Sequence, residues 1–92
     1  MYRRTKMNEQ LVNGARVRYL DGAVVSIDFG WKKFELGQEV ESNGRAADLP
    51  PKGTRGVVVR LWEPNTPETS RPIDILFEGY IFTWHMKVKD LL

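Results

Sequence analysis

The sequence predicts an all-β domain, and three observations support this fold class. Short runs of β-branched and aromatic residues, separated by Gly, Pro and Asn, recur about every ten residues. No stretch shows the sustained apolar periodicity of an amphipathic helix. A two-residue turn at Glu78-Gly79 would place pairs of apolar residues opposite one another on a single face. These features are typical of a small barrel or sandwich.

The N-terminal third predicts a tail followed by a three-stranded meander. Residues 1–14 contain few apolar side chains, and we expect them to form a flexible tail. Residues 15–36 form the meander, with turns at Asp21-Gly22 and Phe29-Gly30. A tight first turn would put Arg16 and Arg18 on the apolar face, so a bulged turn with one more residue is predicted. The buried face then consists of Val17 opposite Ile27, Tyr19 opposite Val25, and Phe34 and Leu36 beside them.

Residues 37–92 carry the strongest strand signals. Predicted strands cover residues 38–42, 55–62, 73–77 and 80–85, and residues 87–92 are expected to close the barrel as a helical turn or a short strand. The Glu78-Gly79 turn pairs Ile75 with Phe82 and Ile73 with Trp84 in the core. Gly53 and Gly56 flank the entry to the second of these strands, where glycine can adopt a positive φ. The sequence thus predicts a barrel of about five strands, extended by the meander.

Four short motifs follow one another over more than half of the chain. They are Leu36-Gly37-Gln38-Glu39-Val40, Pro51-Lys52-Gly53-Thr54-Arg55-Gly56-Val57-Val58, Pro72-Ile73-Asp74-Ile75-Leu76-Phe77-Glu78-Gly79 and Val88-Lys89-Asp90-Leu91-Leu92. In this order they resemble the SH3-like barrels of the KOW and photosystem-accessory type. The resemblance implies an SH3-like barrel over residues 37–92. Such barrels serve as docking subunits, as transcription and ribosome modules and as small phage or plasmid proteins, so the resemblance implies binding without naming a partner.

Length and composition exclude several classes of protein. A chain of 92 residues fits one compact domain with one core. With no cysteine and one histidine it shows neither a disulfide framework nor the spacing of a metal site. No Gly-x-Ser-x-Gly motif or pair of acids accompanies His85, so we expect a surface histidine, no enzymatic activity and no cofactor. No apolar run approaches the ~20 residues of a membrane span, and we expect a cytoplasmic protein without a membrane partner.

The leading hypothesis is a docking or accessory module that binds a protein or a multisubunit complex. Trp31 and Trp62 stand beside basic residues, a composition typical of interface hot spots, although the sequence leaves open whether the meander covers both rings. Pro50-Pro51 and Pro64-x-x-Pro67 stiffen two loops that could form the rim of a groove. The candidate partner-binding residues are Trp62, Arg60, Trp31, Lys52 and Arg55.

The alternative hypothesis is a nucleic-acid-binding small barrel, and it rests on the distribution of charge. The net charge of +2 divides into +4 over residues 1–33, with seven basic and three acidic residues, and −2 over the remainder, with seven basic and nine acidic residues. Such asymmetry can steer an anionic partner to one end of a molecule. The candidate nucleic-acid-binding residues are Arg16, Arg18, Lys32 and Lys33, with Trp31 as a stacking surface.

Overall fold

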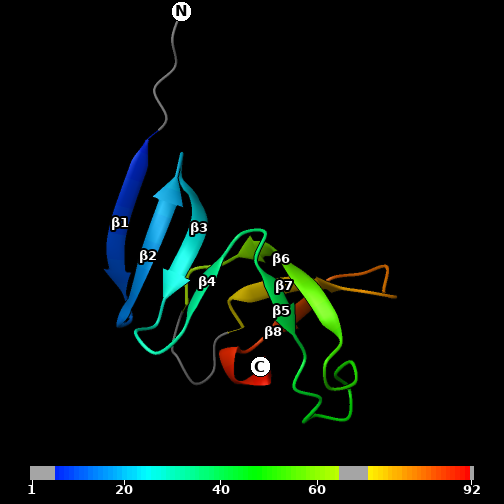
Figure 1. The fold of residues 1–92 in the computed structure, drawn as a ribbon. Helices are drawn as coiled ribbons and strands as arrows, with labels where there is room; N and C mark the ends of the chain where they lie inside the picture. Colours follow the sequence, from blue (N-terminus) through cyan, green and yellow to red (C-terminus); the bar gives the residue numbers. More distant parts are fainter. Residues whose placement is uncertain (1–5, 65–70, 92) are drawn as a thin grey trace, which may run out of the picture.

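The computed structural model describes residues 6–64 and 71–91, which form two antiparallel sheets of four strands each (Figure 1). The N-terminal sheet has the order β1 (Met7–Val12), β2 (Ala15–Leu20), β3 (Ala23–Asp28) and β4 (Lys33–Glu35). The second sheet has the order β5 (Glu39–Glu41), β6 (Arg55–Leu61), β7 (Ile73–Phe77) and β8 (Trp84–Met86). A 3-10 helix, η1 (Val88–Asp90), follows, and the described residues contain no α-helix. The predicted all-β fold class is confirmed.

The hairpin of β1 and β2 turns at Asn13-Gly14. Both residues have positive φ, 49° and 83°, the conformation of a type I′ turn, and this turn sets β1 against β2 along its whole length. The prediction of a flexible tail is therefore wrong for Met7–Val12. Main-chain pairing does not require apolar side chains, and β1 is exposed along most of its length. Residues 1–5 of that predicted tail lie outside the described residues.

The hairpin of β2 and β3 contains the predicted extra residue at a different place. The turn itself is a two-residue one, because Asp21 and Gly22 both have positive φ and Leu20 pairs with Ala23. The irregularity lies within the ladder, next to the pair of Tyr19 and Val24. A type I′ turn matches the right-handed twist of the two strands that it joins. The extra residue is therefore accommodated further along the hairpin, as a bulge in β3.

The side chains around this bulge follow the prediction in part. Val17 pairs with Ile27 as predicted, and both are fully buried, whereas Arg16 and Arg18 are exposed. The predicted pair of Tyr19 and Val25 is wrong, because Val25 is the bulged residue and is only half-buried.

The chain passes from one sheet to the other between β4 and β5. The N–H of Gly37 donates to the carbonyl of Val58 over 2.8 Å, and the N–H of Val58 donates to the carbonyl of Gln38 over 3.0 Å. The positive φ of Gly37, 81°, turns the main chain toward β6, and Leu36 leaves the alternation of β4. Leu36 is therefore 43% exposed, and its predicted place in the buried face is wrong.

The C-terminal segment closes the second sheet. Leu91 forms an antiparallel bridge with Ser42 at the end of β5, and the N–H of Asn43 donates to the carbonyl of Asp90 over 3.1 Å. The helical turn expected within residues 87–92 is η1. The bridge and the turn bring the two ends of this sheet together. The sequence predicts about five strands in this part of the chain, and the structure has four strands and one bridge.

The register of the β7–β8 hairpin differs from the predicted one by two residues. Ile75 pairs with Trp84 instead of Phe82, and Ile73 pairs with Met86 instead of Trp84. The chain does turn at Glu78-Gly79, but residues 81–83 then loop out before β8 begins. A shift of two preserves which face each side chain takes, and it brings Met86, fully buried, into the core in place of Phe82.

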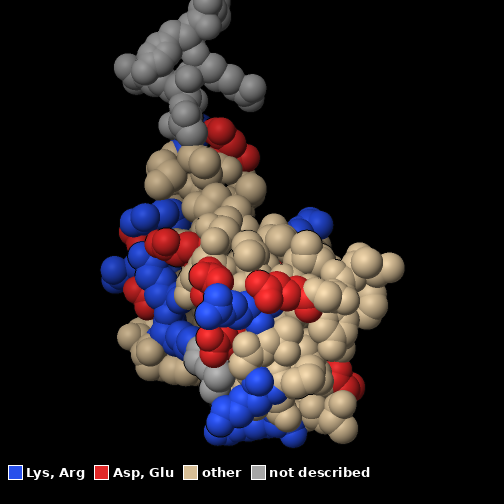
Figure 2. Space-filling view, turned by 45° about the vertical axis from the view of Figure 1, so that its right-hand side comes forward, with Lys and Arg blue, Asp and Glu red and all other residues tan. Residues whose placement is uncertain are grey.

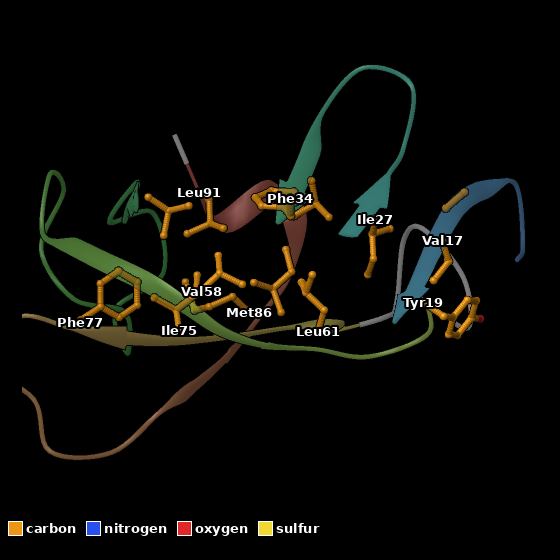
Figure 3. Packing of buried hydrophobic residues seen from close by; sticks show 14 residues of the cluster. Val17, Tyr19, Ile27, Phe34, Val58, Leu61, Ile75, Phe77, Met86 and Leu91 are labelled. Atoms are coloured by element: carbon orange, nitrogen blue, oxygen red, sulfur yellow. The ribbon is translucent and has the colours of Figure 1, made fainter. Parts of the chain in front are cut away.

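One hydrophobic core lies between the two sheets (Figure 3). Phe34 of β4 points toward Val58, Leu61 and Met86 of the second sheet, so the meander is part of the core of the barrel (Figure 3). Fourteen buried apolar residues make up this core: Ala15, Val17, Tyr19, Ile27, Phe34, Val40, Val58, Leu61, Ile73, Ile75, Phe77, Met86, Val88 and Leu91. Both sheets therefore share a single packed interior, to which β1 contributes no fully buried residue.

The two glycines at the start of β6 serve different purposes. Gly53 has a φ of 87°, as the sequence predicts for a loop that turns into a strand. Gly56 has no positive φ, and a Cβ at this position would lie 2.5 Å from Cγ2 of Ile75 and 2.9 Å from a ring carbon of Phe77. Gly56 is required because β7 side chains cover it.

Candidate functional site

A groove of about 610 Å³ runs between the N-terminal sheet and β6. Its lining combines apolar, aromatic and charged side chains: Tyr19, Leu36, Val59, Arg60, Trp62 and Glu63. Leu36, Val59 and Trp62 are each at least 40% exposed, and these three apolar side chains are gathered in the same groove. The groove, called the docking groove below, is the candidate functional site.

A β-bulge at Val59 creates the β6 side of this groove. Val58 pairs with Ile75 and Arg60 pairs with Asp74, so Val59 is the extra residue. The bulge leaves Val59 and Arg60 both exposed, whereas Val58 is buried. Strict alternation along the sequence predicts Val58 on the outer side with Arg60 and Trp62. That prediction is wrong for Val58, because alternation cannot anticipate a bulge.

Trp62 is held in place from two directions. The guanidinium carbon of Arg60 lies 3.8 Å from the centre of the indole ring, a cation–π contact. The indole Nε1–H donates to Oδ2 of Asp74 over 2.9 Å. Trp62 is nevertheless 40% exposed, so an aromatic ring is presented to solvent in a fixed orientation.

The carboxylate that holds Trp62 also contacts His85. Asp74 is buried, with 6% of its surface exposed, and its Oδ1 lies 2.5 Å from Nδ1 of His85 on the neighbouring strand. His85 is exposed, as the sequence predicts for a surface histidine. The carboxylate thus positions two side chains on the outer face of the second sheet, one on each neighbouring strand.

Tyr19 and Asn13 attach the N-terminal sheet to the segment after Trp62. The phenol of Tyr19 hydrogen-bonds to Oε1 of Glu63, and the side-chain amide of Asn13 donates to the carbonyl of Pro64 over 2.8 Å. Burial raises the pKa of Tyr19 to about 12, and the hydrogen bond and negative charge of Glu63 act in the same direction. These contacts fix the width of the groove at one end.

The other predicted partner-binding residues lie elsewhere. Trp31 is 72% exposed in the loop between β3 and β4 and does not line the groove. Lys52 and Arg55 are exposed at the opposite end of β6, roughly 20 Å of strand away from Trp62. Of the five predicted residues, the groove therefore brings together Trp62 and Arg60 alone, and the meander covers neither Trp31 nor Trp62.

The two loops that are predicted to form the rim of a groove lie only partly within the described residues. Pro50 is buried, and its carbonyl accepts a hydrogen bond from the Ser42 hydroxyl over 2.8 Å, so it supports the barrel end near β5. Pro64 is buried next to the groove. Pro67 lies outside the described residues.

The predicted nucleic-acid-binding residues do not form a basic face. In one cross-strand row, Arg16 lies between Leu11 and Asp28, and Lys33 follows on the far side of Asp28. In the second row, Arg18 lies between Glu9 and Ser26, and Glu35 follows on the far side of Ser26. Nε of Arg16 lies 3.7 Å from a carboxylate oxygen of Glu9, and Nζ of Lys33 lies 3.0 Å from one of Glu35. Figure 2 likewise shows basic and acidic side chains interspersed on the face in view.

Lys32 differs from the other three basic residues. It is half-buried, its Nζ donates to the carbonyl of Leu91 over 3.4 Å, and it lies 5.5 Å from the centre of the Phe34 ring. Burial lowers its pKa. Its ammonium group therefore helps to join the N-terminal sheet to the C-terminal segment that closes the second sheet.

Sequence reasoning missed four groove residues, Tyr19, Leu36, Val59 and Glu63. Alternation along the strands places Tyr19 and Leu36 on the buried face, and Val59 stands in a run of three valines that carries no sign of a bulge. Exposed Leu36 follows from the turn at Gly37, the one local signal that could have revealed it.

Comparison of the chain with protein families, with curated proteins and with solved structures finds no match. Over residues 6–64 and 71–91, no three His, Cys, Asp or Glu side chains gather as they would around a metal ion. Within the same ranges, no helix has the length and apolar character needed to span a membrane.

Proposed function

We propose that this chain is a non-enzymatic docking module that holds an extended segment of a protein partner in the groove between its sheets. The observation that carries this proposal is the fixed and exposed ring of Trp62. Hot-spot residues of protein interfaces are enriched in Trp and Arg, and a side chain ordered before binding loses less entropy when the partner arrives. Arg60 and Asp74 supply that order here.

The chemistry of the groove indicates which segment would fit. Leu36, Val59 and Trp62 offer apolar surface for a partner side chain. Glu63 is engaged by Tyr19, whereas the guanidinium of Arg60 has no carboxylate partner within the described residues. The preferred partner segment would therefore carry an apolar residue next to Asp or Glu. The expectation of a cytoplasmic location accompanies this proposal and rests on a chain without cysteine.

A peptide library tests this proposal, because selection from random sequences does not require the partner to be identified first. Peptides displayed on phage would be selected on the immobilised full-length chain, and the affinity of the enriched sequences measured by calorimetry. We expect an apolar residue adjacent to a carboxylate. Trp62→Ala should weaken binding at least about 30-fold, which corresponds to a hot spot of about 2 kcal/mol. Trp31→Ala is the matched control, because it removes an exposed tryptophan outside the groove.

A second variant guards against loss of folding. Arg60→Ala removes an exposed side chain that also stacks on Trp62, so it should weaken every enriched peptide and weaken those that carry the carboxylate most, with the unfolding midpoint unchanged. Enriched peptides that bind Trp62→Ala and Arg60→Ala as tightly as the natural chain, or that depend on Trp31 instead, would refute the groove as the docking site.

A further inference from the structure

A second groove, of about 410 Å³, lies between the β5–β6 loop, β8 and η1 and is called the basic groove below. Three separate stretches of the chain bring cations to it: Arg45 from the β5–β6 loop, Arg71 from the residues before β7, and Lys87 and Lys89 from the segment around η1. Trp84 and His85 of β8 form the adjoining wall. Neither the docking groove nor the N-terminal sheet shares these residues.

The charge of this groove is not neutralised as it is on the N-terminal sheet. Four permanent cations face two carboxylates, Asp48 and Asp90. The carboxylate of Asp90 already accepts the main-chain N–H of Lys87 over 3.3 Å. Within residues 6–64 and 71–91, none of the four cations forms an ion pair. A concave surface with an excess of unpaired positive charge attracts anions.

His85 adds an oriented ring to this groove. Its Nδ1 contacts the buried Asp74 at 2.5 Å, and that carboxylate is itself fixed by Trp62. The contact anchors one side of the imidazole and leaves Nε2 on the other side of the ring, away from Asp74. His85 therefore presents Nε2 in a fixed direction beside the four cations.

An exposed aromatic ring, Phe82, adjoins the basic groove through its contact with Trp84. Phe82 is 57% exposed and Ile81 is 98% exposed on the connection between β7 and β8, which projects from the body of the protein (orange, Figure 1). The ring centre of Phe82 lies 5.7 Å from that of Trp84, with the planes inclined by 32°, and Tyr80 packs edge-on against both. Trp84 and Tyr80 thus pack against the Phe82 ring, which remains more than half exposed to solvent.

We propose that this groove binds single-stranded nucleic acid, with phosphates on Arg45, Arg71, Lys87 and Lys89 and a base stacked on Phe82 or Trp84. Proteins that bind single strands combine a basic groove along the backbone with aromatic rings on which bases stack. A double helix would satisfy the cations but keep its bases stacked inside, and the exposed ring of Phe82 would have no partner. The proposal concerns a different surface and a different ligand from the docking groove.

Fluorescence anisotropy of a labelled deoxythymidine oligomer of about ten nucleotides tests this proposal on the full-length chain. If all four cations contact phosphates, the logarithm of affinity should fall with the logarithm of salt with a slope of roughly −3. Arg71→Ala with Lys89→Ala should roughly halve that slope. Arg16→Ala with Arg18→Ala is the matched control, since it removes the same charge from the N-terminal sheet, and it should leave the slope unchanged.

Phe82→Ala separates stacking from charge. It should weaken binding about tenfold at every salt concentration and leave the slope as it was. Inorganic polyphosphate, duplex DNA and vesicles with phosphatidylserine serve as competitors, and each should displace the oligomer less well than unlabelled oligomer does. The proposal fails if the oligomer does not bind at low salt, if the control pair lowers affinity as much as the groove pair, or if any competitor equals the oligomer.

Discussion

The carboxylate of Asp74 lies between Trp62 and His85, accepting the indole N–H at 2.9 Å through Oδ2 and contacting the imidazole Nδ1 at 2.5 Å through Oδ1. Asp74 comes from β7, His85 from β8, and Trp62 follows β6 directly, and the pairing of these strands brings the three together. Trp62 lines the docking groove and His85 lines the basic groove. One buried carboxylate therefore supports both candidate sites.

Asp74→Asn is expected to lower the free energy of unfolding by about 1–3 kcal/mol. The amide keeps the size of the side chain but offers one acceptor oxygen to two partners. Urea unfolding measures the change, and Asp48→Asn, at an exposed position, is the control. Equal stability of Asp74→Asn and the natural chain would show that the carboxylate does not hold the cluster together.

Stability should depend on pH in the alkaline range through Tyr19. Its pKa is raised to about 12, chiefly by burial, so the folded protein holds the phenolic proton more tightly than the unfolded chain does. This stabilisation is complete below about pH 10 and is lost as the pH rises through about 12. Tyrosinate absorbance should show an ionisation near pH 12 that Tyr19→Phe removes. If the step that Tyr19→Phe removes lies near pH 10 instead, the raised pKa of Tyr19 is contradicted.

Ile75→Ala and Phe82→Ala should differ strongly in their effect on stability. Ile75 is fully buried, and its truncation should cost about 2–5 kcal/mol, as expected for a core residue. Phe82 is 57% exposed, and its truncation should cost less than about 1 kcal/mol. Chemical denaturation of the two variants distinguishes the observed register from the one in which both residues are core neighbours. Similar large losses of stability in both variants would favour the register in which both residues lie in the core.

Gly56→Ala should destabilise the protein even though it introduces one methyl group. That group would lie 2.5 Å from Ile75 and 2.9 Å from Phe77, both of which are buried and cannot move freely. Overpacking of this kind costs about 1–3 kcal/mol. Val57→Ala, at the exposed neighbouring position, is the control for thermal unfolding and should have a smaller effect. A neutral Gly56→Ala would mean that β7 can shift to make room.

The sequence predicts those parts of the fold that follow regular alternation. The pair of Val17 and Ile27, the burial of Ile73, Ile75 and Phe77 and the exposure of His85 all result from side chains alternating along strands. Alternation fails at Val25 and Val59, where bulges insert a residue with no distinctive chemistry. The docking groove depends on the second of these bulges, so only Trp62 and Arg60 could be selected from the sequence.

The basic groove was beyond sequence reasoning for a different reason. Its cations Arg45, Arg71 and Lys89 are separated by many residues and lie in the part of the chain whose net charge is −2. Average charge therefore favours residues 1–33, whereas strand register places acidic residues next to Arg16, Arg18 and Lys33. Local charge density is a property of the folded surface, and here it differs from the charge of the segment.

The Asn13-Gly14 turn provides the last prediction, because β1 packs mainly against β2. Gly14 has a φ of 83°, and an alanine there would cost about 1–2 kcal/mol in a left-handed conformation. Since β1 is largely exposed, we expect Gly14→Ala to loosen this strand without unfolding the core. Hydrogen exchange should then speed up for the amides of β1 and of their partners in β2, whereas the amides of β6 and β7 keep their protection. Gly30→Ala, in the loop before β4, also replaces a glycine of positive φ and controls for a general loss of stability. Faster exchange throughout β6 and β7 would indicate instead that the N-terminal hairpin and the barrel unfold together.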